Sequence, residues 1–335
     1  MKNLCLASYS LSLFLKRNVF IKTPLTLFME ISVIVPAYNE KENIEKLFFA
    51  IKNVIENQIK TSFEVIFIDD GSTDDSWQLI ERLADEQSEV KGFRFSKNFG
   101  HQYALKAGID YALGDAVISI DADFQQPPEL IVKMYKEWKN GNQIVYALRK
   151  KTKGTGILKK LSSALFYKIM NILSDVKLEN GASDFRLLDR KVVDELKKMN
   201  EYYLFIRGLV KWVGYKTKSI EYVAEKRYSG KTKYSAKKMF SFAQTGIMSF
   251  SIKPLRLATF FGFLISLFAF AYIVYALFAK FIFHNVLEGW TSILISVLLI
   301  GGIQLITIGI IGEYIGKLFL EVKKRPTYII SDKKE

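Results

Sequence analysis

Cysteine and histidine are scarce in this chain of 335 residues, which contains one cysteine and two histidines. Because Cys5 is the single thiol, the sequence excludes an internal disulfide framework. His101 and His284 lie far apart in the sequence, which argues against a zinc site built on histidines. The chain also lacks Gly-x-Gly-x-x-Gly and Gly-x-x-x-x-Gly-Lys-Ser/Thr, so neither a dinucleotide fingerprint nor a P-loop is present.

Charge is absent from two long stretches, Leu257–Ala279 and Gly289–Gly312. As helices rising about 1.5 Å per residue, each is long enough to cross a hydrocarbon core of about 30 Å. A buried core helix is the alternative for one such run, but two adjacent runs favour a transmembrane hairpin. Basic residues flank the pair, namely Lys253, Arg256, Lys317, Lys323, Lys324 and Arg325. The positive-inside rule predicts a multi-pass protein of the plasma (inner) membrane with both termini in the cytoplasm.

Positive charge is concentrated: the net charge is +14, and residues 216–256 hold ten basic and two acidic side chains. Nucleic acid or an anionic membrane surface fits such a patch, and the uncharged runs that follow favour the membrane. Ser235–Ile252 has an apolar stripe that predicts an amphipathic membrane-interface helix, with an ordinary packed helix as the alternative. Residues 1–28 have four basic residues and no acids. We expect a poorly ordered or membrane-touching extension there, with a secretory signal as the alternative and Met29 as a candidate start.

Apolar, β-branched segments alternate with helical segments through the first half of the chain. The predicted strands are Ile31–Tyr38, Phe63–Asp70, Val90–Ser96, Ala116–Asp123 and Gln143–Leu148. The predicted helices are Glu40–Lys60, Asp75–Gln87, Gly100–Leu113 and Pro127–Asn140. Asn39 and Glu42 fit a capping box, and Gly114 is a candidate C′ residue. This alternation predicts an α/β fold with a Rossmann-like, mostly parallel sheet and helices on both faces.

Further elements complete the predicted division of the chain. Helical periodicity marks Leu161–Leu173 and Lys191–Met199, a short strand is expected at Ser183–Leu188, and Thr217–Ala224 fits an edge strand. The expected parts are an N-terminal extension (1–29), a cytoplasmic α/β domain (30–234), an interface helix (235–256), two transmembrane helices (257–279 and 289–312) and a cytoplasmic basic tail (313–335).

Acidic residues gather where the predicted strands end. Asp69 and Asp70 end the second strand, Asp121 and Asp123 end the fourth, and Glu40 follows the first. Ligands of such sheets bind outside the carboxyl ends of the strands. Carboxylates without nearby histidine or cysteine suit Mg²⁺ or Mn²⁺ held together with a substrate phosphate. The alternative for Asp121 and Asp123 is that they are only turn formers after a strand.

Seven motifs together carry a resemblance to a known family. They are VPAYNE (Val35–Glu40), DDGSTD (Asp69–Asp74), KNFGHQYALKAGID (Lys97–Asp110), DADFQQPPE (Asp121–Glu129), SDFRLLDR (Ser183–Arg190), RYSGKTKYS (Arg227–Ser235) and GEYIGKLFLEVKKRPTY (Gly312–Tyr328). From about Ile31 to Tyr328 the chain resembles family 2 glycosyltransferases of the GT-A fold. The most similar branch loads a sugar onto a polyprenyl phosphate, as in the bactoprenol glucosyltransferases of O-antigen (lipopolysaccharide) modification and dolichyl-phosphate mannose synthases.

The resemblance implies roles for individual residues. Asp121 and Asp123 would be the catalytic, metal- and diphosphate-binding pair, with Gln125 beside the Mg²⁺ or Mn²⁺ ion. Pro36, Tyr38, Glu40 and Asp70 would form the nucleotide pocket, and Arg207 would meet the donor diphosphate. Arg227 and Lys233 would face the acceptor phosphate, or else only a lipid headgroup surface. The implied partners are a nucleotide sugar, a polyprenyl phosphate lipid, the membrane and further copies of the chain, a tetramer being one such homo-oligomer, without nucleic acid.

The implied reaction is an inverting transfer of a hexose, with glucose from UDP-glucose as the first choice, to undecaprenyl or dolichyl phosphate. One departure is Gln126, where the family usually has aspartate. The loss of that carboxylate points to helix N-capping as the main role of the position. Asp184 could be a general base or a structural strand-end acid, and His101, Lys97 and Asn98 are expected to be structural. The competing functions are a processive polysaccharide synthase and a non-catalytic membrane scaffold or flippase component.

Overall fold

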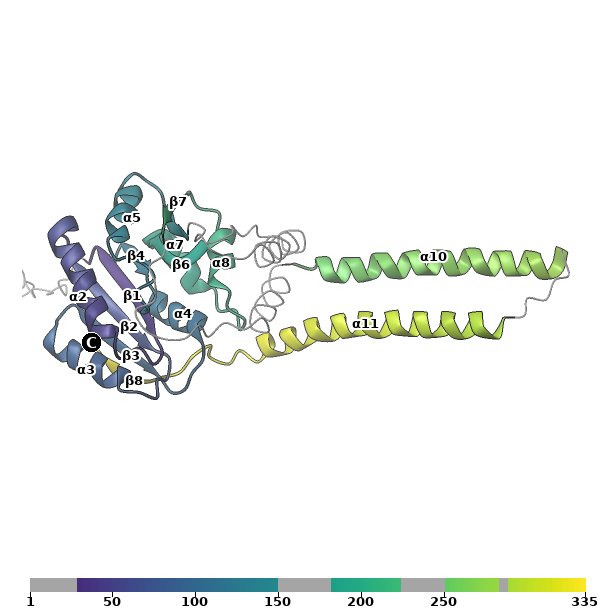
Figure 1. The fold of residues 1–335 in the computed structure, drawn as a ribbon, viewed down its shortest axis with the longest axis horizontal. Coiled ribbons are helices and arrows are strands. Elements are labelled where there is room, and N and C mark those ends of the chain that lie inside the picture. Colours follow the sequence, from purple (N-terminus) through teal and green to yellow (C-terminus); the bar gives the residue numbers. More distant parts are fainter. Residues whose placement is uncertain (1–28, 150–181, 224–250, 283–288) are drawn as a thin grey trace, which may run out of the picture.

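A computed structural model describes residues 29–149, 182–223, 251–282 and 289–335. Its centre is an eight-stranded sheet with the order β7-β5-β6-β4-β1-β2-β3-β8. The strands are β1 (Ile31–Ala37), β2 (Phe63–Asp69), β3 (Val90–Phe95), β4 (Ala116–Ser119), β5 (Ile144–Arg149), β6 (Ala182–Asp189), β7 (Thr217–Tyr222) and β8 (Ile330–Lys334). Figure 1 shows the sheet at the heart of one compact part of the chain. The predicted α/β fold with a mostly parallel sheet is confirmed, and β7 is the predicted edge strand.

The direction of β6 makes the sheet mixed. β1 pairs in parallel with β2 and β4, whereas β6 is antiparallel to both β4 and β5. The amino-terminal end of β6 therefore lies at the same edge of the sheet as the carboxyl end of β4, with Arg186 opposite Ser119. We call this end of the strands the mouth of the sheet. Side chains from the carboxyl end of β4 and from the amino-terminal end of β6 meet there.

Helices cover both faces of the sheet and bury two separate hydrophobic cores. On one face α2 (Ile44–Val54), α3 (Ser76–Glu86) and α5 (Leu130–Lys139) pack against the strands. On the other face lie α4 (His101–Tyr111), α7 (Arg190–Lys198) and α8 (Ile206–Trp212). Every residue of β1 and β2 is buried, which is why these strands read as continuous apolar runs rather than as alternating ones.

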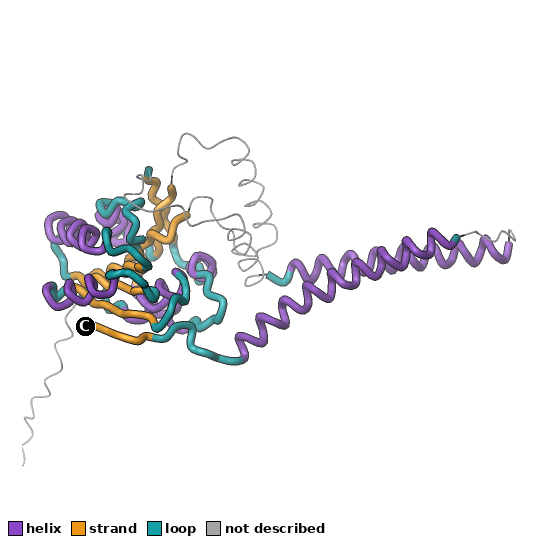
Figure 2. Tube along the Cα trace, turned by 60° about the horizontal axis from the view of Figure 1, so that its bottom comes forward, coloured by secondary structure: helices purple, strands orange, loops and turns teal. Residues whose placement is uncertain are grey.

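Two long helices project together from the domain, as Figures 1 and 2 show from different sides. They are α10 (Lys253–Ile282) and α11 (Trp290–Val322); α10 extends beyond its predicted uncharged run at both ends, and α11 extends beyond its run at the C-terminal end. Each contains a segment long and apolar enough to cross a membrane, and neither segment is buried in the protein. Large apolar side chains are therefore exposed along them, with Phe268 and Leu305 each 72% exposed. A soluble core helix would bury such residues, so the exposure favours an apolar surrounding.

The C-terminal end of the chain returns to the sheet, which the sequence reading missed. β8 pairs antiparallel with β3 and forms the second edge of the sheet. The ring of Tyr328 stacks on Phe95 with 5.2 Å between centroids, and its hydroxyl donates to Asp110 Oδ2 at 2.9 Å. Residues 313–335, expected to be a cytoplasmic basic tail, continue α11 in their first part and form a strand in their last part, whereas their location in the cytoplasm stays a prediction. This strand has the sequence ISDKK, and its charged residues gave no apolar pattern by which it could be predicted. Charged side chains are common on edge strands, because they discourage pairing with another chain.

Three local predictions near the sheet are also wrong. The first helix begins at Ile44, and Asn39 has φ 55° and uses its side chain to accept a hydrogen bond from Thr73 N, so no capping box forms. Gly114 is no C′ residue with positive φ; it is needed because a Cβ there would lie 2.5 Å from Ser32 N. β4 ends at Ser119, two residues before Asp121, so the acidic pair lies in a loop.

Several predictions lie outside the described residues. They concern the extension 1–28, the helix Leu161–Leu173, most of the interface helix Ser235–Ile252 and the two acceptor-phosphate residues Arg227 and Lys233.

Candidate active site

The loops after β1 and β2 form one side of the mouth, and side-chain hydrogen bonds connect them. Tyr38 follows β1 and is 36% exposed, whereas Pro36 is buried within the strand. Glu40 accepts a hydrogen bond from Asn43 Nδ2 at 2.7 Å, and its N–H donates to Ser76 Oγ at 3.0 Å. The structure thus brings Tyr38 and Glu40 to one loop at the carboxyl end of the sheet, with Pro36 in the strand that leads into this loop.

Asp70 has a structural partner at this edge. Its carboxylate is buried and accepts hydrogen bonds from the backbone N–H groups of Phe99 (2.7 Å) and Gly100 (3.0 Å). Burial raises the pKa of Asp70, although these two N–H groups oppose the rise. Asp70 therefore fixes the loop that leads into α4. Gly71 allows the loop after β2 to lie against the loop that leads into α4. Its φ is 69°, and a Cβ at this position would lie 2.5 Å from the Lys97 carbonyl carbon.

Asp121 and Asp123 lie in the tight loop between β4 and α5. Phe124 within it has φ 57°, a left-handed conformation that is rare for a bulky residue and that stores strain of about 1–3 kcal/mol. Asp123 Oδ1 accepts a hydrogen bond from Gln125 N at 3.1 Å, and the Gln125 Oε1 atom lies 3.4 Å from Arg149 Nη1. The loop thus places the two carboxylates close enough for the charge of Asp123 to raise the pKa of Asp121.

Gln126 binds Asp121 and does not cap the following helix. The residue is 4% exposed, its Oε1 accepts from Asp121 N at 2.9 Å, and its Nε2 donates to Asp121 Oδ2 at 2.6 Å. The N-cap of α5 is Glu129, without any side-chain capping bond. The N-capping interpretation of Gln126 is therefore wrong, because the side chain folds back onto the loop that precedes the helix.

Asp184, near the start of β6, is the centre of a cluster of cations. It accepts hydrogen bonds from Arg207 Nε (2.9 Å) and Nη2 (2.8 Å) and from Arg186 Nη2 (2.8 Å). His101 Nε2 lies 3.6 Å from Asp184 Oδ2 and 3.5 Å from Asp121 Oδ1, which links the cluster to the acidic loop. Arg207, the predicted diphosphate-binding residue, is thus held beside the mouth by a buried carboxylate.

The charges of this cluster keep Asp184 ionised. Burial raises its pKa, but the charge of Arg207 and the contacts with His101 and Arg207 outweigh that effect and hold the pKa well below its usual range. A carboxylate with so low a pKa is a weak base, so the structural alternative for Asp184 fits better than general-base catalysis. Burial lowers the pKa of His101, whereas Asp184 and Asp121 raise it, and the net change is a rise.

Asp121 lies in an environment that favours added positive charge. Burial raises its pKa, and the negative charges of Asp184 and Asp123 add to the rise against the opposing charge of His101. A cation between Asp121 and Asp123 would relieve this repulsion.

The donor set at the mouth fits a hard divalent cation. Asp121, Asp123 and Gln125 offer carboxylate and amide oxygens, which Mg²⁺ and Mn²⁺ prefer. Over residues 29–149, 182–223, 251–282 and 289–335, no group of three or more His, Cys, Asp or Glu side chains is arranged to hold a metal alone. An ion bound by Asp121 and Asp123 would therefore need further oxygens, such as those of a substrate diphosphate.

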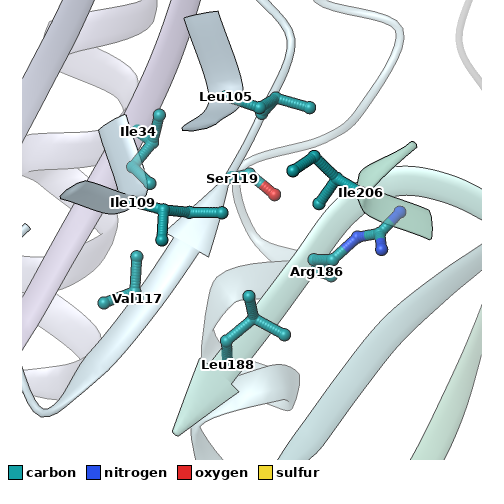
Figure 3. Close-up of a pocket in the computed structure, with 8 residues that line it drawn as sticks. All are labelled: Ile34, Leu105, Ile109, Val117, Ser119, Arg186, Leu188 and Ile206. Atoms are coloured by element: carbon teal, nitrogen blue, oxygen red, sulfur yellow. The ribbon is translucent and has the colours of Figure 1, made fainter. Parts of the chain in front are cut away.

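Below the mouth the protein is apolar. Figure 3 shows a small pocket between the sheet and helices α4 and α8, lined by Ile34, Leu105, Ile109, Val117, Leu188 and Ile206 together with Ser119 and Arg186. Its cavity volume of about 10 Å³ is close to that of one water molecule and far too small for a sugar nucleotide. The guanidinium of Arg186 borders this apolar layer, which explains why it is paired with Asp184.

Sequence reasoning missed the partners of His101, the place of Arg186 and the role of Gln126. His101, which was expected to be structural, lies between two carboxylates of the mouth, an arrangement compatible with that role. The signal that could have identified Arg186 was its place in SDFRLLDR, two residues after Asp184 on the same face of a strand. No local pattern could have revealed His101, because its partners are 20 or more positions away along the chain.

Comparison with known proteins divides the chain in the same way. Residues 32–197 match the family described as glycosyl transferase family 2, and residues 253–318 match the GtrB C-terminal hairpin. The chain is 43% identical over 302 residues to the uncharacterized glycosyltransferase YkcC of Bacillus subtilis (strain 168), covering 90% of this chain and 93% of that protein. It is 42% identical over 302 residues to the prophage bactoprenol glucosyl transferase homolog of Escherichia coli (strain K12), covering 90% and 98%.

A third relative is the bactoprenol glucosyl transferase of Shigella phage SfX, 40% identical over 306 residues that cover 91% of this chain and 100% of that protein. The sequence similarity spans both the α/β domain and the two exposed helices, so the resemblance read from the motifs is confirmed. This chain therefore belongs to glycosyl transferase family 2, with the GT-A fold and a GtrB-type hairpin at its C-terminal end.

Proposed function

We propose that this protein transfers a hexose, with glucose from UDP-glucose as the first choice, to a polyprenyl phosphate at the cytoplasmic face of the membrane. The observation that carries the proposal is the arrangement of Asp121 and Asp123 beside Arg207 at the mouth of the sheet. Relatives named bactoprenol glucosyl transferases, similar over nine-tenths of the chain, support this choice of sugar and carrier.

In the proposed reaction a phosphate oxygen of the acceptor attacks the anomeric carbon while the bond to the nucleoside diphosphate breaks. A phosphate monoester carries between one and two negative charges near pH 7, because its second pKa is about 6. The nucleophile therefore needs no strong general base, in agreement with the low pKa of Asp184. In-line attack on the opposite face from the leaving group inverts the anomeric centre.

The leaving diphosphate is where the protein must supply stabilisation. Asp121 and Asp123, with Gln125, would hold Mg²⁺ or Mn²⁺, and the ion when bound would offset the charge that develops on the diphosphate. Arg207 lies close enough to Asp121 for its charge to lower the pKa of that carboxyl, and it is oriented by two hydrogen bonds to Asp184. Pro36, Tyr38, Glu40 and the loop held by Asp70 are the proposed nucleotide pocket. Arg227 and Lys233 are the proposed acceptor-phosphate residues.

The two exposed helices support a location of the acceptor at a membrane surface. A polyprenyl phosphate keeps its chain in the bilayer and its phosphate at the surface, so the enzyme must lie on the membrane. We propose that α10 and α11 cross the membrane as a hairpin, with the α/β domain and both termini in the cytoplasm, where nucleotide sugars are made. The basic flanks at Lys253, Arg256, Lys323 and Lys324 support that orientation. We also propose that several copies of the chain assemble into a homo-oligomer.

The test is a transfer assay with the full chain in membranes and each labelled nucleotide sugar in turn. Label in a mild-acid-labile lipid, lost in Asp123→Asn while the variant stays folded, is the expected result. Label in polymer would instead identify a processive synthase, and no label with any donor would indicate a scaffold or flippase component. Turnover of Asp123→Asn near the wild-type rate with Mg²⁺ or Mn²⁺ present would overturn the proposed role of the acidic pair.

A further inference from the structure

The Gln126 side-chain amide makes both of its hydrogen bonds to Asp121. It is buried, and a buried amide needs partners for both its carbonyl and its amino group. Both are found on Asp121: the carbonyl accepts from the backbone N–H, and the amino group donates to Oδ2. The orientation of the amide follows from its partners, because a backbone N–H can only donate and an ionised carboxylate can only accept.

The two hydrogen bonds between Gln126 and Asp121 begin where the backbone hydrogen bonds between β4 and its neighbouring strands end. The N–H of Ile120 still donates to Ile34 O on β1 at 3.0 Å, so the chain is strand-like up to that residue. The next N–H, that of Asp121, has Gln126 as its acceptor. Gln126 thus closes the loop from 121 to 126, which contains the left-handed Phe124 and both acidic residues. An open loop would release the strain at Phe124 and let the carboxylates move apart.

The two oxygens of Asp121 consequently have different surroundings. Oδ2 is bound by Gln126 at 2.6 Å, and Oδ1 lies 3.5 Å from His101 Nε2. The amide donates a hydrogen bond without adding charge, so the carboxylate keeps its negative charge for a cation. An ionised carboxylate at position 126 could accept from the Asp121 N–H but would repel Oδ2.

We infer that Gln126 is a positioning residue that holds the Asp121 carboxylate in place to bind a divalent cation. The inference rests on the proposed function, since it assigns a ligand to Asp121. Partners that orient metal-binding side chains change metal affinity or activity by about 10–100-fold when they are removed. Gln126 is therefore part of the machinery of this site, although it touches neither the sugar nor the diphosphate.

The decisive variant is Gln126→Met, which keeps the length of the side chain and removes both hydrogen bonds. Its control is Asn142→Leu, since Asn142 is also buried and its amide bonds the Glu137 carbonyl at the opposite edge of the sheet. Mn²⁺ binding to the detergent-solubilised full chain with UDP is followed by the loss of the free Mn²⁺ signal in electron paramagnetic resonance. Thermal unfolding without metal is measured in parallel. Gln126→Asn, one methylene too short for both contacts, serves if the methionine variant does not fold.

We expect Gln126→Met to raise the Kd of Mn²⁺ by about 10–100-fold and Asn142→Leu to leave it unchanged. Transfer by Gln126→Met should recover when Mn²⁺ is raised by the same factor, while the KM of the acceptor lipid stays constant. Wild-type Mn²⁺ affinity in a Gln126→Met variant with a lowered melting temperature would overturn the inference and leave the proposed function standing. Absence of Mn²⁺ binding by the wild-type chain with UDP would overturn both.

Discussion

Replacing Asp184 by asparagine removes the negative charge at the centre of the cation cluster while keeping the side-chain shape. The Asp184 and Arg186 side chains are each 6% exposed, and Arg207 is 29% exposed. Breaking a buried ion pair on one side costs about 3–5 kcal/mol, because the other charge stays buried without compensation. The Arg207 contact adds less, since solvent screens it. Asparagine still accepts a hydrogen bond, so we expect a loss near the lower limit, about 3 kcal/mol.

For a domain of about 200 residues, each kcal/mol lowers the melting temperature by about 2–4 °C. Asp184→Asn should therefore melt about 6–12 °C below the wild type, measured by thermal unfolding of the full chain in detergent at pH 7. Asp75→Asn is the matched control, because its pair with Lys41 is exposed at 72% and 48%. We expect no measurable change for the control. Equal melting temperatures for the two variants would refute the reasoning.

The pH dependence gives a second check of the same charge. Folding lowers the pKa of Asp184, so its ionised form stabilises the fold above the unfolded-state pKa of about 3.9. This contribution is lost as the pH falls below that value toward the folded-state pKa. Because Asp184 also raises the pKa of His101, the difference in melting temperature between wild type and Asp184→Asn should grow as His101 takes up a proton on acidification from pH 8. It should then narrow below about pH 4, where Asp184 itself takes up a proton. A difference that keeps widening below about pH 4 would contradict the assignment.

Three further outcomes are expected. Chelation with EDTA should abolish transfer of labelled sugar to lipid, and Mn²⁺ or Mg²⁺ should restore it; full activity in EDTA would contradict the metal proposal. Tyr328→Phe removes the hydrogen bond to Asp110 and should cost about 1 kcal/mol in thermal unfolding, and an unchanged melting temperature would show that β8 docks without it. Gly108→Ala places a Cβ 2.1 Å from Ile34 Cγ2 and should destabilise the domain by about 1–3 kcal/mol, whereas Gly262→Ala, with open space around it, should be neutral in the same measurement.

Much of the α/β domain was predictable because its signals are local. The strands β1 and β2 are continuous apolar runs, and the structure begins each of them at the predicted residue. Helix ends were predicted less well. The Asn39–Glu42 capping pattern failed because Asn39 bonds Thr73 in the neighbouring loop, a contact that no local pattern encodes.

The candidate site was half predictable for the same reason. Asp121 and Asp123 follow a strand, and the carboxyl ends of parallel strands meet at one edge, so their location could be argued from the sequence. Asp184 and Arg186 reach that edge only because β6 runs antiparallel to β4, and strand direction is a property of the whole sheet. His101 joins them from the start of a helix on one face. Its place depends on how α4 packs.

The sequence by itself determined the layered α/β domain, the acidic residues at or after the strand ends and the two long uncharged runs within α10 and α11, since each depends on neighbouring residues and on hydrophobic burial. Only the tertiary structure decided that β8 returns to the sheet, that Asp184 gathers Arg186, Arg207 and His101, and that Gln126 binds Asp121 rather than capping α5. The physical reason is common to most of these findings: side chains far apart in the chain become partners once the sheet order is fixed. Gln126 lies only five residues from Asp121 but needs the loop to fold back.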